Sequence, residues 1–306
     1  AINRLERTNM PAVGFKYPDG EEVSFEDIFE NGKLKLEKMG IVMPMLRELA
    51  KQRDPDRKPS VTECLIGTCE AYLKRTEDYY IDPQEHAFAL AGTLHHSRLE
   101  NNADEGTSEI AMEGLDITGI VDLYDEESKS LIDYKNVGSY KVGQALGLDF
   151  YLEDDPSGAV YLRKGKWGQK GDPKKVRRYW MNPEKADLGD WEWQINCYRY
   201  MLEKQGKEIK NMYVQVTVRD GGIQAARDRG VERKIYLIEV PYIHNDHIID
   251  KFTEKRDSLL NSLTLGKLPE ICSEEERWGG KKCEFYCDAR EVCPYNKDKF
   301  KEINFG

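Results

Sequence analysis

Two aspartates and a lysine on neighbouring predicted strands are the residues with the clearest catalytic chemistry in this chain. Residues 117–136 alternate apolar and polar side chains, and a charged turn at 125–128 divides them into two strands. Asp122 lies near the end of the first strand, whereas Asp133 and Lys135 share one face of the second. Carboxylates bind hard divalent cations and a lysine can orient or deprotonate water, so the group suits metal-assisted phosphodiester hydrolysis. The alternative is a set of solvated surface charges.

Three cysteines near the C-terminal end of the chain indicate a metal site. Cys283, Cys287 and Cys293 fall within eleven residues, and a proline follows the last of them. Such clusters recur in iron–sulfur ligation, and a Cys₄ zinc site needs the same thiolates. The chain has seven cysteines, an odd number, and no recognisable secretory signal, which favours metal ligation over a disulfide framework. The fourth ligand must come from elsewhere, and Cys272 could substitute for one ligand.

Residues 155–190 are predicted to form a long, turn-rich excursion from the core. Basic side chains are interleaved there with Trp167, Tyr179 and Trp180. The basic residues are Arg163, Lys164, Lys166, Lys170, Lys174, Lys175, Arg177 and Arg178. This combination is typical of a track for single-stranded nucleic acid with stacking platforms, and a solvated charged loop is the alternative.

Composition indicates a folded protein with ample core. The 306 residues are 39% hydrophobic and carry a net charge of −10, which argues against a protein that coats nucleic acid through bulk charge. A nucleic-acid enzyme with a local basic groove and an acidic centre remains compatible with this charge. No apolar run approaches the roughly 20 residues that span a bilayer, so we expect a soluble, cytoplasmic protein without membrane association. No Walker A sequence is present, so a helicase would be a separate partner.

The pattern of elements predicts an α/β fold in which a mixed sheet is flanked by helices. Residues 1–33 are predicted to be an irregular or lightly structured arm, and Pro44 makes 34–51 either a kinked helix or two short helices. Further helices are predicted at 61–75 (with Ser60 and Glu63 as a capping box), 83–101, 142–146, 191–204, 222–229 and 244–263, and strands at 108–113, 212–218 and 234–240. The predicted domains are an N-terminal arm and helix (1–59), a core (60–266) and a Cys-rich tail (267–306).

Four short motifs occur in a fixed order along the chain, namely Gly92-x3-His96, Gly119-x2-Asp122, Asp133-x-Lys135 and Gln194-x3-Tyr198. Together with the C-terminal cysteines they resemble the nuclease module of the RecB-type branch of the PD-(D/E)XK superfamily. The iron–sulfur members, such as the AddB nuclease domain and the CRISPR-associated RecB-like exonucleases, match best. The resemblance spans roughly residues 60–294. It implies a restriction-endonuclease-like mixed sheet with a helical N-terminal region and a Cys-rich, metal-binding C-terminal tail that packs back on the N-terminal helix.

The resemblance also implies a catalytic metal site. His96, Asp122 and Asp133 would bind Mg²⁺ or Mn²⁺, helped by the backbone carbonyl of Tyr134. The register after the motif glycine favours His96 over the neighbouring His95. A buried, hydrogen-bonded histidine is the alternative for His96.

The same resemblance assigns supporting roles and an activity. Lys135 would position the attacking water and stabilise charge on the phosphate. Gln194 and Tyr198, four residues apart on one helix face, would support the active site or touch DNA. The implied function is a metal-dependent DNA exonuclease acting on single-stranded ends, in repair, recombination, CRISPR adaptation or phage DNA metabolism. The alternatives are a non-catalytic nucleic-acid-binding or assembly subunit and a zinc-stabilised structural protein.

A [4Fe–4S] cluster is implied by resemblance to the iron–sulfur members, with the ligands Cys69, Cys283, Cys287 and Cys293. Cys69 matches the family's upstream cysteine better than Cys64, because an aromatic-containing helical stretch follows it. The relatives usually space the first two tail cysteines by two residues, and here three lie between them. Structural Zn²⁺ is the main rival for the site. Cys197 is predicted to be a small core residue.

Overall fold

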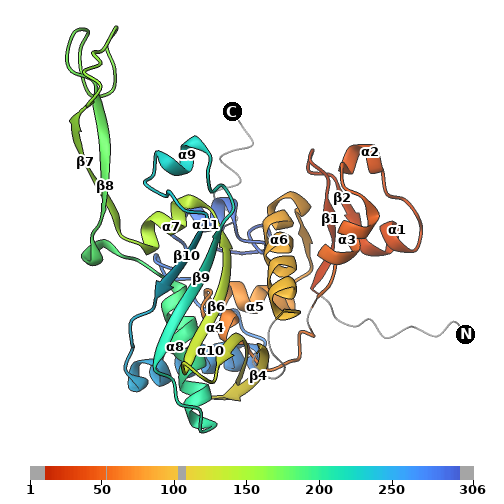
Figure 1. Cartoon of the computed structure of the whole chain (residues 1–306). Helices are drawn as coiled ribbons and strands as arrows, with labels where there is room; N and C mark the ends of the chain where they lie inside the picture. The colour runs from red at the N-terminus through yellow and green to blue at the C-terminus, as the bar shows by residue number, and fades with distance from the viewer. Residues whose placement is uncertain (1–10, 53, 103–107, 297–306) are drawn as a thin grey trace, which may run out of the picture. The chain divides into compact units, whose positions relative to one another are not determined.

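The computed structural model describes residues 11–52, 54–102 and 108–296 (Figure 1). The chain divides into two compact units. Unit 1 comprises residues 1–101, 111–120 and 244–306, and unit 2 comprises residues 102–110 and 121–243. The chain therefore passes between the units four times, and residues 121–243 are the longest continuous stretch of unit 2. Within the described residues, no helix is long and apolar enough to cross a membrane.

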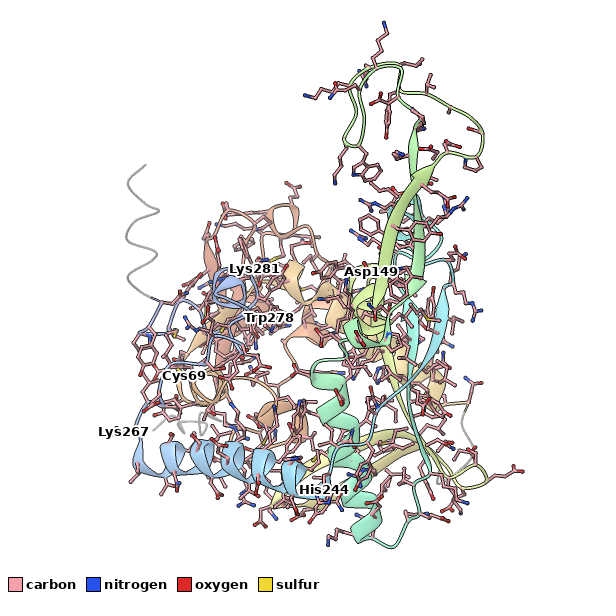
Figure 2. All side chains as sticks on the ribbon, turned by 90° about the vertical axis from the view of Figure 1, so that its left-hand side faces the viewer. Cys69, Asp149, His244, Lys267, Trp278 and Lys281 are labelled. Atoms are coloured by element: carbon pink, nitrogen blue, oxygen red, sulfur yellow. The ribbon has the colours of Figure 1, made fainter. Side chains whose placement is uncertain are left out.

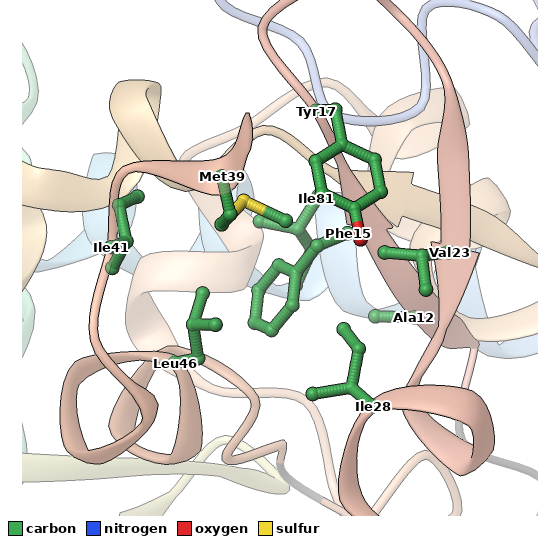
Figure 3. Close-up of a cluster of buried hydrophobic side chains, with 9 residues drawn as sticks. All are labelled: Ala12, Phe15, Tyr17, Val23, Ile28, Met39, Ile41, Leu46 and Ile81. Carbon is green, nitrogen blue, oxygen red and sulfur yellow. The ribbon is translucent and has the colours of Figure 1, made fainter. Parts of the chain in front are cut away.

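Unit 1 contains a small three-stranded sheet in the order β2-β1-β3. Strand β1 (Ala12–Lys16) pairs antiparallel with β2 (Glu22–Ser24) and parallel with β3 (Tyr79–Ile81). A β-carbon at Gly14 would stand 2.2 Å from the carbonyl oxygen of Val23, so only glycine permits this close approach. The buried core beneath it consists of Ala12, Phe15, Tyr17, Val23, Ile28, Met39, Ile41, Leu46 and Ile81 (Figure 3).

The prediction of an irregular arm is wrong for residues 11–33, whereas residues 1–10 lie outside the described residues. The strands there are held by β3, which comes much later in the chain, and local periodicity does not show such pairing. Three short helices follow β2, namely α1 (Phe25–Phe29), α2 (Leu36–Met39) and α3 (Met43–Leu49). Pro44 lies in the first turn of α3, so the alternative of two short helices over 34–51 is confirmed.

The helix predicted over 61–75 is interrupted. Ser60 and Glu63 form the predicted capping box of α4 (Val61–Cys64), but α5 (Thr68–Thr76) starts anew after Gly67. A β-carbon at Gly67 would stand 2.3 Å from the Cys272 sulfur, so this interruption is where the C-terminal segment packs. Two long helices, α6 (Pro83–Glu100) and α10 (Asn245–Leu265), form close to the predicted bounds. Figure 2 labels His244 and Lys267, which flank α10, and α10 packs against α4 and α5.

The larger sheet is mixed and has the strand order β10-β9-β6-β5-β4. Its strands are β4 (Ser108–Gly114), β5 (Ile117–Asp125), β6 (Ser130–Val137), β9 (Asn211–Val218) and β10 (Ile235–Glu239). The β5–β6 and β9–β10 pairs are antiparallel, and β6 pairs parallel with β9. In unit 2, α7 (Ser139–Ala145) packs against β9, and α8 (Asp190–Lys204) packs against β6 and β9. The predicted α/β class with helices flanking a mixed sheet is confirmed.

A two-stranded arm, residues 148–181, replaces part of the predicted excursion. β7 (Leu148–Asp154) pairs antiparallel with β8 (Lys175–Met181) along their whole length, from Leu148↔Met181 to Asp154↔Lys175 (Figure 1). Figure 2 labels Asp149 near the base of this arm. Residues 175–181 of the predicted excursion therefore form a regular strand, whose alternation of polar and apolar side chains is obscured by frequent charges. Residues 155–174 form the loop at the tip of the arm. The remaining short elements are η1 (Pro183–Lys185), α9 (Gln224–Arg227) and α11 (Lys281–Phe285).

Candidate active site and cysteine pocket

The hairpin of β5 and β6 brings the two predicted catalytic aspartates next to each other. Leu123 of β5 pairs with Ile132 of β6, and Asp122 and Asp133 are the adjacent residues on the two strands. Both carboxylates are buried, with relative exposures of 7% and 3%. The backbone N–H of Tyr134 donates a hydrogen bond of 2.7 Å to Oδ2 of Asp122, which fixes that carboxylate against β6. Two buried negative charges side by side require compensation by cations or hydrogen-bond donors.

Lys135 supplies one such compensating charge. Its Nζ lies 2.7 Å from Oδ2 of Asp133 and donates a hydrogen bond of 2.9 Å to Oε1 of Gln194. The side chain of Lys135 is 19% exposed, so the ammonium stands at the boundary between the buried carboxylates and solvent. The predicted juxtaposition of Asp133 and Lys135 on one strand face is therefore present.

Helix α8 carries the remaining members of the group on its buried face. Gln194 donates from Nε2 to the hydroxyl oxygen of Tyr198 at 3.0 Å, as the spacing of four residues allows. Burial raises the pKa of Tyr198, the hydrogen bond with Gln194 acts in the opposite direction, and the charges of Asp133 and Asp122 raise it further. Tyr198 is thus a neutral phenol that holds the Gln194 amide in one orientation. A continuous chain of contacts runs from Asp133 through Lys135 and Gln194 to Tyr198.

His96 belongs to unit 1, whereas the rest of the predicted catalytic group belongs to unit 2. It lies in α6, is partly exposed, and its ring centroid lies 6.4 Å from that of His95. Burial and the neighbouring His96 lower the pKa of His95. The role of His96 as a metal ligand stays a prediction, as does that of the Tyr134 carbonyl.

The oxygen donors present suit a hard cation. In the part of the chain that the structure describes, no group of three or more His, Cys, Asp or Glu side chains has the arrangement of a metal site. A complete protein cage is not required for Mg²⁺, which usually keeps several waters and is held by one or two carboxylates together with substrate phosphate oxygens. The adjacent carboxylates of Asp122 and Asp133 fit that mode of binding.

Five cysteines of unit 1 surround one pocket of about 60 Å³. They are Cys69, Cys272, Cys283, Cys287 and Cys293. The four predicted cluster ligands are therefore brought together, and Cys272, which the sequence suggested only as a substitute, joins them. Figure 2 labels Cys69 in α5 and, in the C-terminal segment, Trp278 and Lys281. Cys64 is buried in α4 and does not line this pocket, and Cys197 is a fully buried core residue of α8, as predicted.

The thiols of this pocket interact directly. Hydrogen bonds with Cys272 and Cys293 raise the pKa of Cys69, and the bond with Cys69 lowers the pKa of Cys272 to about 7. Burial raises the pKa of Cys287 to about 12 and also raises that of Cys283. A bound metal cation would lower the pKa values of the thiols that coordinate it, because it binds their thiolate form. Thiolates are the ligands of iron–sulfur clusters and of structural Zn²⁺, but among the described residues these five thiols do not have the arrangement of a metal site.

Ion pairs fasten the segment that carries these cysteines to the helices of unit 1. Asp288 accepts from Lys74 of α5 at 2.6 Å and contacts His86 Nε2 of α6 at 2.8 Å. Lys282 pairs with Glu70 of α5 at 2.6 Å. Asp288 was not predicted from the sequence, where its position one residue after Cys287 was the only available signal.

The chain was also compared with known proteins, and neither the protein-family models nor the curated protein sequences gave a match. The resemblance to a nuclease family therefore depends on the sequence motifs alone.

Proposed function

We propose that the chain is a divalent-metal-dependent deoxyribonuclease with the restriction-endonuclease-like (PD-(D/E)XK) fold, acting on DNA ends. The observation that carries this proposal is the partly buried contact of Lys135 with both Asp133 and Gln194, beside Asp122. Buried ion pairs stabilise a fold little, because the cost of desolvating the charges offsets their attraction. A carboxylate pair and a lysine held in this way on a rigid sheet therefore favour a catalytic role over a structural one.

Asp122 and Asp133 would hold Mg²⁺ or Mn²⁺, and the resemblance adds the carbonyl of Tyr134 as a further ligand. The metal would supply Lewis-acid polarisation of the phosphate and a lowered pKa of a bound water. Lys135 would place its ammonium against the attacking water and the phosphate oxygens, where negative charge increases in the transition state. Gln194 would keep Lys135 in this position.

The five-cysteine pocket would hold a structural [4Fe–4S] cluster, with Zn²⁺ as the alternative. Four thiolates suffice for either group, and five surround the pocket. Because these cysteines come from α5 and from the C-terminal segment, a bound group would join parts of unit 1 that are distant in sequence. A visible charge-transfer band from anaerobically purified protein would identify iron, since the filled d shell of zinc gives none.

The test is degradation of end-labelled single- and double-stranded DNA with Mn²⁺ or Mg²⁺. We expect metal-dependent cleavage that is lost in Asp133→Ala and Lys135→Ala. The matched control is Glu127→Ala, because the Glu127 carboxylate is exposed in the turn of the same hairpin. This variant should cleave DNA like the wild type. Cleavage that survives in both active-site variants would refute the assigned centre. An inactive, cluster-loaded wild type would favour the non-catalytic binding subunit.

A further inference from the structure

One face of the arm presents two exposed aromatic rings on either side of an arginine. Tyr151 pairs with Arg178 and Asp149 pairs with Trp180, so all four side chains share this face. The relative exposures of Tyr151 and Trp180 are 56% and 47%. Arg178 forms an ion pair with Glu153 on the same face. Exposed aromatic rings that lie together on one face can form an interaction site.

The opposite face of the arm is used differently, because its aromatic residues already have partners within unit 2. The rings of Phe150 and Tyr179 lie 5.8 Å apart, and the guanidinium of Arg177 lies 4.6 Å from the Phe150 ring centroid. Arg177 and Tyr179 both donate hydrogen bonds to the carbonyl oxygen of Asp228. This face therefore attaches the base of the arm to the loop after α9, and leaves the face with Tyr151 and Trp180 available for a ligand.

The loop at the tip of the arm is packed around Tyr161 and is positively charged. The ring of Tyr161 fits between Gly165 and Gly168, where a β-carbon at either glycine would stand 2.6 Å from it. The Tyr161 hydroxyl accepts from the backbone N–H of Lys175, which closes the loop onto β8. Between 155 and 174, five exposed basic side chains accompany two carboxylates, those of Asp155 and Asp172. They are Arg163, Lys164, Lys166, Lys170 and Lys174.

We propose that the arm binds single-stranded DNA, with unpaired bases stacked on Tyr151 and Trp180 and phosphates bound by the basic tip. A positively charged segment in a chain of net charge −10 complements a polyanion, and exposed rings complement bases that are free to unstack. Paired bases cannot reach the rings, which selects single strands over duplex. The choice of DNA rests on the proposed nuclease function. The arm adds a binding surface separate from the Asp133 group.

The test measures binding of a fluorescent oligo(dT) to the full chain by anisotropy, without added divalent metal. Tyr151→Leu and Trp180→Leu should each raise the dissociation constant by about fivefold to a hundredfold, because each removes one ring on which a base stacks. Trp180→Phe should retain most of the affinity. Leu162→Ala is the matched control, since Leu162 is 85% exposed in the same arm and is not aromatic.

Salt dependence separates the two parts of the arm. Lys164→Ala combined with Lys166→Ala should flatten the plot of log affinity against log salt by about 0.7 for each phosphate that is no longer neutralised. The two leucine variants should leave that slope unchanged. The proposal is overturned if Tyr151→Leu and Trp180→Leu bind like the wild type, if duplex DNA binds as tightly as oligo(dT), or if oligo(rU) binds more tightly.

The outcomes of this test and of the nuclease test are distinguishable. Asp133→Ala should bind oligo(dT) like the wild type while losing cleavage. Arm-dependent binding by a wild type that never cleaves would overturn the nuclease function and leave the arm as a binding surface. Cleavage with normal binding by Tyr151→Leu and Trp180→Leu would overturn the arm proposal alone.

Discussion

Replacing Lys135 with methionine tests whether its ammonium neutralises the buried carboxylates. The 2.7 Å contact with Asp133 corresponds to an attraction of about 6 kcal/mol at an effective dielectric constant of about 20, most of which desolvation offsets. Removing one partner of a buried pair costs about 3–5 kcal/mol, because the other charge is left uncompensated. Lys135 keeps 19% exposure, which admits some water to Asp133, so we expect a loss of about 2–4 kcal/mol in the free energy of unfolding.

The assay is urea denaturation at pH 7, without divalent metal, of the Lys135→Met and Asp133→Asn variants and of the double variant. The double variant should recover part of the loss, with a coupling energy of about 1–3 kcal/mol. Lys210→Met is the matched control, because Lys210 is exposed and its carboxylate partner, Glu208, lies 3.8 Å away, so its effect should stay within about 0.5 kcal/mol. A coupling energy near zero would refute the reasoning, since the lysine would then not compensate Asp133.

Three further predictions concern unit 1. Cys287→Ser should lower the melting temperature and the bound metal content together, as measured by calorimetry and elemental analysis; unchanged values would contradict a structural metal site. Burial alone would raise the pKa of Asp288, but the hydrogen bond with His86 and the charge of Lys74 outweigh it and lower that pKa. Asp288→Asn should therefore be less stable than the wild type at pH 7, and the difference in melting temperature should shrink below about pH 4, where the wild-type contribution is lost. Gly14→Ala should destabilise the N-terminal sheet by about 1–3 kcal/mol in denaturant unfolding, because the added methyl group meets a backbone carbonyl.

Local patterns predicted the elements whose contacts are close in sequence. The hairpin of β5 and β6 and the helix α8 follow from a clear period of two and a clear amphipathic face, and they bring Asp133, Lys135 and Gln194 together. The motif spacing anticipated these contacts, since residues two apart on a strand and four apart on a helix share a face. Asp122 could be placed beside Asp133 because a tight turn sets the hairpin register.

Features that depend on distant partners were not predictable in this way. The N-terminal strand β1 pairs with β3 from beyond α3, and nothing within residues 11–33 indicates that partner. The break between α4 and α5 occurs where Cys272 approaches Gly67, a contact that no local propensity encodes. The sequence of strand β8 predicts a loop because charges occupy both of its faces. The role of Asp288 depends on its contacts with His86 and Lys74, which are distant in sequence.

The order in which the chain builds its two units has a consequence for its biosynthesis. Unit 2 takes most of its residues from one continuous stretch, 121–243, whereas the cysteine pocket of unit 1 needs Cys69 as well as Cys272 and Cys293. At a translation rate of about 5–20 residues per second, Cys69 emerges from the ribosome roughly 10–40 s before Cys272. Unit 2 can fold during that interval, while α5 still lacks Cys287 and Ala289, which pack against it in the finished fold. Insertion of the proposed metal would then be a late step of maturation, and nascent chains stalled before residue 272 should be the most susceptible to oxidation and to chaperone capture.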